Sequence, residues 1–192
     1  MLQVEDFYHF DGQSRDYGIA GNRFRAYRDY SLPPSKVYRH WASLKTEDVL
    51  GGHFPSMTDQ RAFAEWHRDL FESINNHWFS EQGQKISFAH TSKLLDLYLK
   101  WLMTNQKCPD QLASAILHYG DCALDSQILF RLNQCLSGDL PIKNSTMGHI
   151  LNRNTYVFCQ ELIKDFAEKF GGTRILFDFY AWEPGGFQKT RS

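Results

Sequence analysis

The segment AHTSKLLDLYLKWL, residues 89–102, decides how the fold is interpreted. It is apolar enough to form a buried helix, yet it carries Lys93 near its start. The segment ALDSQIL, residues 123–129, follows, and its Asp125 stands directly before an apolar-periodic run. An Asp in that position is typical of a helix N-cap, because its carboxylate accepts free N–H groups of the first turn. Two helices are therefore predicted, with Lys93 and Asp125 separated by 125 − 93 = 32 positions.

Apolar residues at helical spacing predict further helices on both sides of these segments. The expected helices span about 35–50, 58–79 with Thr58 or Asp59 as the cap, 87–105, 110–119, about ten residues after Asp125, and 147–170. The tail TRILFDFYAW, residues 173–182, fits a strand or a last buried helix, and periodicity leaves both open. The predicted fold is mainly α, a single compact domain of six or seven helices. An irregular N-terminal arm (1–35) precedes a helical core (58–182).

Composition and charge restrict the class of protein. The chain has 192 residues, of which 42% are apolar, which suits one domain with one core. The net charge of −1 provides no overall attraction for nucleic acid, so any anionic partner needs a local basic patch. The N-terminus lacks the pattern of a signal peptide, and no apolar run approaches the roughly 18 residues of a membrane span. We therefore expect a cytoplasmic protein that does not associate with membranes.

Cysteine and histidine spacing gives no support for a metal or a cofactor. Gaps of 14, 13 and 24 residues separate the four cysteines and fit no CxxC pattern, so reduced thiols are expected. The eight histidines include no HExxH or similar spacing, and His67 and His77 lie ten residues apart on one predicted helix. No glycine-rich phosphate loop follows a strand. The sequence thus predicts neither a metal nor a cofactor.

Lys93 and Asp125 have a structural interpretation and a chemical one. Asp96 at i+3 and Lys100 at i+7 would make a solvated stripe with Lys93, and Asp125 would be a cap and nothing more. Alternatively, a lysine beside an apolar helix face is partly desolvated, which favours the neutral, nucleophilic amine. A fixed carboxylate next to it would stabilise positive charge developing on a sugar. That pairing suits attack at an anomeric carbon through a Schiff base.

The segments SKLLDLYLKWL and ALDSQIL, with looser support from FDFYAW, resemble the helix–hairpin–helix DNA glycosylases that use a Lys/Asp pair. The long interval between lysine and aspartate is most similar to the archaeal 8-oxoguanine glycosylase branch, over about residues 85–182. This resemblance implies a helix–hairpin–helix-like fold with DNA as the partner. It also implies Lys93 as the nucleophile, Asp125 as the assisting carboxylate, and a target base flipped into a pocket. His90 and Trp182 are the candidate base-binding residues, with core packing as the alternative for each.

The resemblance implies a DNA glycosylase acting on a damaged or modified base, and it leaves open whether a lyase step follows. Modified phage DNA is one such substrate, although no residue argues for it specifically. A hairpin of the Leu-Pro-Gly-Val-Gly type is absent, which favours a second hypothesis, a non-enzymatic helical module that binds a protein.

The segment RDYGIAGNRFRAYRDY, residues 15–30, alternates arginines with aromatics. It fits a DNA-facing arm or a loop whose aromatics pack under the core.

Overall fold

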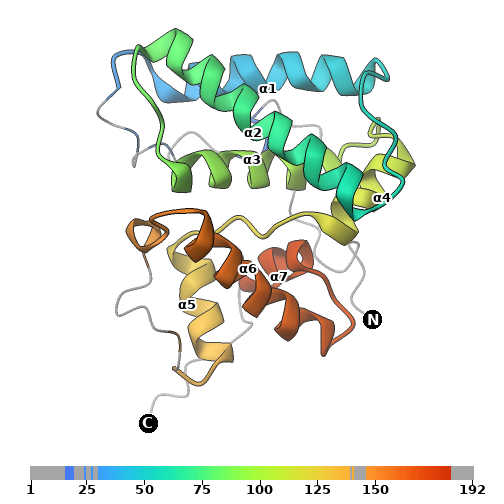
Figure 1. Cartoon of the computed structure of the whole chain (residues 1–192), viewed down its shortest axis with the longest axis vertical. Coiled ribbons are helices and arrows are strands. Elements are labelled where there is room, and N and C mark those ends of the chain that lie inside the picture. Colours follow the sequence, from blue (N-terminus) through green and yellow to red (C-terminus); the bar gives the residue numbers. More distant parts are fainter. Residues whose placement is uncertain are drawn as a thin grey trace.

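The computed structural model describes residues 16–19, 24, 27, 30–138, 140 and 146–182. Within these residues the chain forms seven α-helices, one short 3₁₀ helix and no strand (Figure 1). In chain order the elements are α1 (Pro34–Leu50), α2 (Gln60–Gln82), α3 (Phe88–Met103), α4 (Asp110–Tyr119), α5 (Ser126–Cys135), η3 (Met147–His149), α6 (Arg153–Glu168) and α7 (Arg174–Trp182). The prediction of a single, mainly α domain is confirmed.

The helices form two halves that meet at α3. Helices α1 to α4 make the first half and α5 to α7 the second. Figure 1 shows α3 on the side of the first half that faces the second. Each half has its own cluster of buried apolar side chains, around Trp41 and Tyr98 in the first and around Ile128 and Ile163 in the second. Helix α7 joins the clusters, because its Ile175, Leu176 and Phe179 belong to the first, while its Phe177 and Ala181 belong to the second.

Side-chain caps fix where several helices begin. Asp59, one of the two residues predicted as the cap of α2, accepts from the Ala62 N–H, and Asp125 caps α5 as predicted. The expected helix over 147–170 is wrong at its start. Residues Met147–His149 form a 3₁₀ turn, and α6 begins only at Arg153, where the Asn152 side chain supplies the cap. The undecided tail is helical, and it forms α7.

The predicted solvated stripe of Lys93, Asp96 and Lys100 does not exist. Asp96 is 1% exposed and Lys100 is 5% exposed. The Tyr156 hydroxyl of α6 donates to Asp96, and Lys100 pairs with Asp178 of α7. The stripe fails because α3 is covered by both halves of the molecule. Polar groups on α3 therefore meet partners from the helices packed around it instead of water.

Most of the N-terminal arm lies outside the described residues, including Arg15, Arg23, Arg25 and Arg28. The described aromatics Phe24 and Tyr27 are buried in the first cluster, as expected for aromatics packed under the core. Gly18 has a φ of 85°, and a Cβ there would lie 2.3 Å from the Leu97 carbonyl oxygen. Only glycine allows the chain to approach α3 so closely.

No helix among the described residues is both long and apolar enough to cross a membrane. All four cysteines are free thiols, in agreement with the expected reduced state. Burial raises the pKa of the Cys108 thiol to about 12 and that of the Cys159 thiol to about 11. Because the thiolate is the reactive form, burial lowers the reactivity of these two thiols.

Candidate functional site

Lys93 and Asp125 lie together in the folded chain. The Lys93 Nζ is 3.7 Å from the Asp125 Oδ2, and the two side chains are 16% and 13% exposed. Lys93 comes from the first turns of α3 and Asp125 from the N-terminus of α5, so the ion pair bridges the two halves of the molecule. The pair is therefore largely screened from solvent while part of each side chain stays accessible.

The two oxygens of Asp125 have different tasks. Oδ1 accepts the backbone N–H groups of Gln127 and Ile128, both at 2.9 Å, and this completes the cap of α5. Oδ2 is the oxygen that faces Lys93. The cap fixes the orientation of the carboxylate, and the positive end of the helix dipole stabilises negative charge at this point. Asp125 thus presents one oriented anionic oxygen to the lysine.

His90 lies near Lys93, one turn earlier on α3. Its Nδ1 is 2.8 Å from the Ser87 hydroxyl, and its ring centroid is 4.4 Å from that of Tyr27. Burial lowers the pKa of His90, and the positive charge of Lys93 lowers it further. His90 is therefore an electrostatic neighbour of the lysine, and a base-contacting role stays a prediction.

Trp182 ends α7 and is 44% exposed, so part of its side chain is accessible from solvent. The preceding residue, Ala181, accepts a hydrogen bond from the Gln127 Nε2 at 3.2 Å, and Gln127 belongs to the turn that Asp125 caps. The end of α7 therefore lies beside the start of α5. Whether the Trp182 ring stacks on a base stays a prediction.

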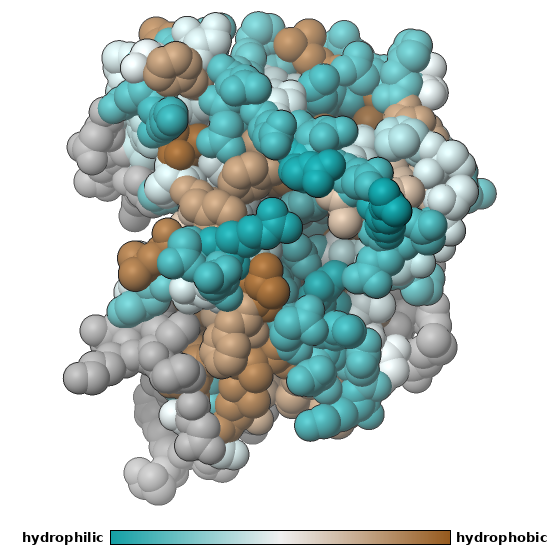
Figure 2. All heavy atoms as spheres, viewed as in Figure 1, coloured by the Kyte–Doolittle hydropathy of each residue, from teal (hydrophilic) through white to brown (hydrophobic). Residues whose placement is uncertain are grey.

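A cavity of about 210 Å³ opens where α2 approaches α6 and the start of α7. Figure 2 shows mainly hydrophilic side chains over this region. The aromatic lining residues are Phe63, Phe71, Phe88, Tyr119 and Tyr156, and the basic ones are His67, Arg68, Arg153 and Arg174. Ser92 also contributes, but neither Lys93 nor Asp125 lines this cavity. The pair and the cavity use neighbouring faces of α3, since successive helical residues point about 100° apart.

Beside the cavity lies a polar network that the sequence analysis missed. The His67 Nε2 is 3.5 Å from Asp96 Oδ1, and the Tyr156 hydroxyl donates to Asp96 Oδ2 at 2.7 Å. Arg174 pairs with Asp121 at 3.1 Å. The network escaped notice because its members come from α2, α3, α6, α7 and the α4–α5 connection, with no local motif.

Protonation of this network is shifted toward the acid forms. Burial raises the pKa of Asp96 to about 7, although hydrogen bonds from His67 and Tyr156 act in the opposite direction. Burial acts to lower the pKa of His67, but the hydrogen bond and charge of Asp96 outweigh it, and the net direction is upward. The two groups therefore hold a proton between them more firmly than either would in water.

The fold and these sites define a compact, all-helical domain with a lysine–aspartate pair at the junction of its halves. The chain matches no protein-family model, and comparisons with curated proteins and with solved structures give no match to it. The functional argument therefore rests on the residues of this chain.

Proposed function

We propose that the protein is a DNA glycosylase with a helix–hairpin–helix-like core, which excises a damaged or modified base. The observation that carries this proposal is the ion pair of Lys93 with Asp125 at 3.7 Å. A lysine that faces an oriented carboxylate suits nucleophilic attack on a sugar, because the amine can form the covalent bond and the carboxylate can stabilise positive charge on the sugar. The resemblance of both segments to the Lys/Asp glycosylases adds support.

In this proposal the Lys93 ammonium passes one proton to the departing base, and the resulting neutral amine attacks C1′ of the extruded nucleotide. The bond between C1′ and the base nitrogen breaks, and the base leaves with the electron pair and that proton. Asp125 Oδ2 stabilises the positive charge that develops on the sugar before the new bond is complete. Proton loss from the lysine and opening of the sugar ring give a Schiff base, from which water releases the sugar or β-elimination cleaves the strand.

Contacts with DNA need positive charge near the pair, since the chain as a whole is slightly acidic. Arg68 and Arg153 are exposed at the 210 Å³ cavity and can contact phosphates. His90 and Trp182 are the residues that we propose contact the base. A flipped base needs an aromatic platform and hydrogen bonds, and the half-exposed Trp182 ring can provide the platform.

Borohydride trapping tests the proposal directly. The protein is incubated with oligonucleotides that carry oxidised, deaminated, hydroxymethylated or glucosylated bases, or an abasic site, and borohydride reduces any Schiff base to a stable adduct. Wild type is compared with Lys93→Ala, and with Lys107→Ala as a matched control at an exposed lysine in the loop after α3. A protein–DNA band that needs Lys93 and survives loss of Lys107 supports the proposal, and its lane identifies the base. Absence of both the band and base release on every substrate refutes it.

A second candidate function, a helical module that binds a protein, is favoured by one observation. An apolar cavity of about 200 Å³ lies between α6 and α7, and its lining includes Phe166, Phe170, Leu176, Phe177 and Tyr180. Phe170, just after the end of α6, is 64% exposed, and Phe158 on α6 is 48% exposed. Figure 2 shows apolar side chains gathered on this lower half of the molecule. If no substrate is trapped or cleaved, this function takes first place.

A further inference from the structure

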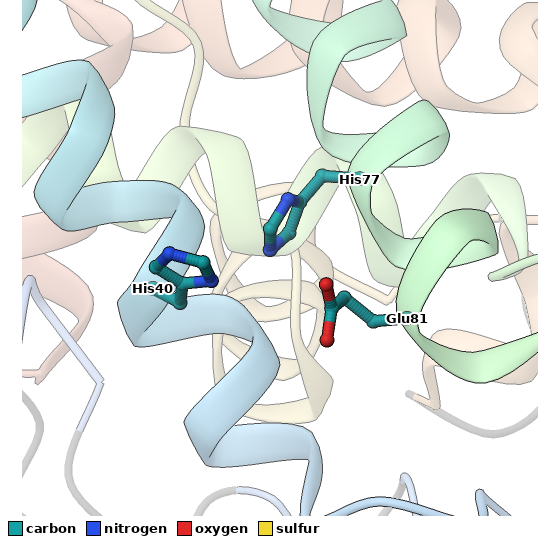
Figure 3. Close-up of side chains that lie close together, drawn as sticks. All are labelled: His40, His77 and Glu81. Carbon is teal, nitrogen blue, oxygen red and sulfur yellow. The ribbon is translucent and has the colours of Figure 1, made fainter.

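A cluster of metal-ligating side chains lies at the contact between α1 and α2, away from Lys93 and Asp125. His77 and Glu81 occupy i and i+4 on α2, so they share one face of that helix. His40 reaches them from α1. One ligand atom from each of the three residues lies within 4.8 Å of the other two, and Figure 3 shows the side chains pointing toward one another.

We propose that His40, His77 and Glu81 bind a divalent transition-metal ion, with zinc as the best match. Two imidazole nitrogens and one carboxylate oxygen form a borderline ligand set that suits zinc, with water completing a tetrahedron. Tetrahedral ligands at about 2.0–2.1 Å from zinc lie roughly 3.3 Å apart. The ligand atoms now lie within 4.8 Å of one another. His40 and Glu81 are exposed, and rotation of their side chains can shorten this spacing to that of zinc ligands.

The state of His77 supports a ligand role. Its Nε2 is buried and has no hydrogen-bond partner among the described residues. A buried nitrogen without a partner is costly, and a bound metal would give it one.

A second group of possible metal ligands, His67, Asp96 and Asp121, is a weaker candidate for a metal site. Tyr156 donates to Asp96 and Arg174 pairs with Asp121, so both carboxylates already have partners. A metal ion there would also meet the positive charge of Arg174. Among the described residues, by contrast, His40, His77 and Glu81 take part in no salt bridge, so their ligand atoms are not engaged in this way.

Zinc titration of the full chain, freed of metal by chelation, tests the proposal. Calorimetry of the wild type should give one zinc per chain, with a rise in the unfolding temperature on binding. Loss of a ligand in His40→Ala, His77→Ala or Glu81→Gln should weaken binding roughly tenfold or more, at least as much as loss of an outer-shell partner. His53→Ala, at an exposed histidine in the loop after α1, is the matched control and should bind like wild type.

Cobalt provides a second readout that does not depend on stability. The visible absorption of the Co²⁺ form should indicate four-coordinate nitrogen and oxygen ligands and should vanish in His40→Ala. His40 is exposed, so that variant should fold even if His77→Ala does not. Equal zinc affinity in wild type and His40→Ala, sulfur-to-metal absorption that points to the cysteines, or no saturable binding would each overturn the proposal.

Discussion

Replacing Lys100 by methionine should destabilise the protein severely. Lys100 pairs with Asp178 between α3 and α7, and the two side chains are 7% and 1% exposed. Asp178 Oδ2 also accepts the Ala123 N–H at 3.1 Å, and the Lys100 Nζ lies 4.1 Å from the centre of the Phe179 ring. Methionine fills a similar volume but leaves the Asp178 carboxylate buried opposite an apolar chain.

Removing one partner of a buried ion pair costs about 3–5 kcal/mol in the free energy of unfolding. The hydrogen bond from the Ala123 N–H to Asp178 stays in place, so the expected loss of unfolding free energy lies toward the lower end of that range. For a chain of 192 residues, each kcal/mol lowers the unfolding temperature by about 2–4 °C, so the fall should be roughly 6–20 °C. The double variant Lys100→Met/Asp178→Asn removes both charges and keeps an acceptor for Ala123. It should lose much less than the two single variants together.

Urea unfolding, followed by tryptophan fluorescence and far-UV circular dichroism, measures these free energies. The control is Lys45→Met, which breaks the exposed pair with Asp48 and should cost less than about 1 kcal/mol. A loss below about 1 kcal/mol in Lys100→Met would refute a buried, charged pair. An additive double-mutant cycle would refute the coupling between Lys100 and Asp178.

Three further predictions concern single positions. Asp125→Ala should lower the free energy of unfolding by about 1 kcal/mol through loss of the α5 cap, and Asp125→Asn should keep most of it in the same urea assay. Burial raises the pKa of Asp96 to about 7, above its unfolded value, so the folded chain binds this proton more tightly. Protonated Asp96 therefore contributes fully to stability in acid, and this contribution is lost as the pH rises through about 7. The free energy of unfolding of Asp96→Asn, measured against pH, should not show this decrease. Gly18→Ala should cost more than the roughly 1–2 kcal/mol expected for Gly52→Ala. Both glycines have positive φ, but only Gly18 is crowded, so equal losses of unfolding temperature would contradict the contact with α3.

Local signals in the sequence predicted the helices because caps and apolar spacing act over a few residues. Asp59, Asp125 and Gly120 mark the predicted boundaries in the structure. The predicted start of α6 at residue 147 was wrong because Ile150 and Leu151 continue the apolar pattern, while the Asn152 cap starts the helix at Arg153, 153 − 147 = 6 residues later. The tail was undecided because its burial comes from contacts with both clusters, which periodicity within the tail does not reveal.

Partners across long separations were beyond the reach of the sequence. Asp96 and Lys100 have the spacing of a solvated stripe, and only the packing of α6 and α7 against α3 explains their burial. The cluster around His77 was missed for the same reason, since its third member, His40, comes from another helix. Asp125 was anticipated as a cap from its place before an apolar-periodic run. Its pairing with Lys93, at 3.7 Å in the structure, was expected from the resemblance to the Lys/Asp glycosylases, not from local spacing.

The position of that carboxylate also bears on what the pair is for. A cap needs only one oxygen, and Asp125 Oδ1 takes both backbone N–H groups. Its Oδ2 lies 3.7 Å from the Lys93 Nζ, beyond good hydrogen-bond distance, so we expect the pair to add little to stability. Asp125→Asn separates the two tasks, because its amide oxygen can still cap α5 while the charge facing Lys93 is lost. We expect it to unfold like wild type and to form at least tenfold less trapped DNA adduct, whereas equal trapping at equal stability would make Asp125 a cap and nothing more.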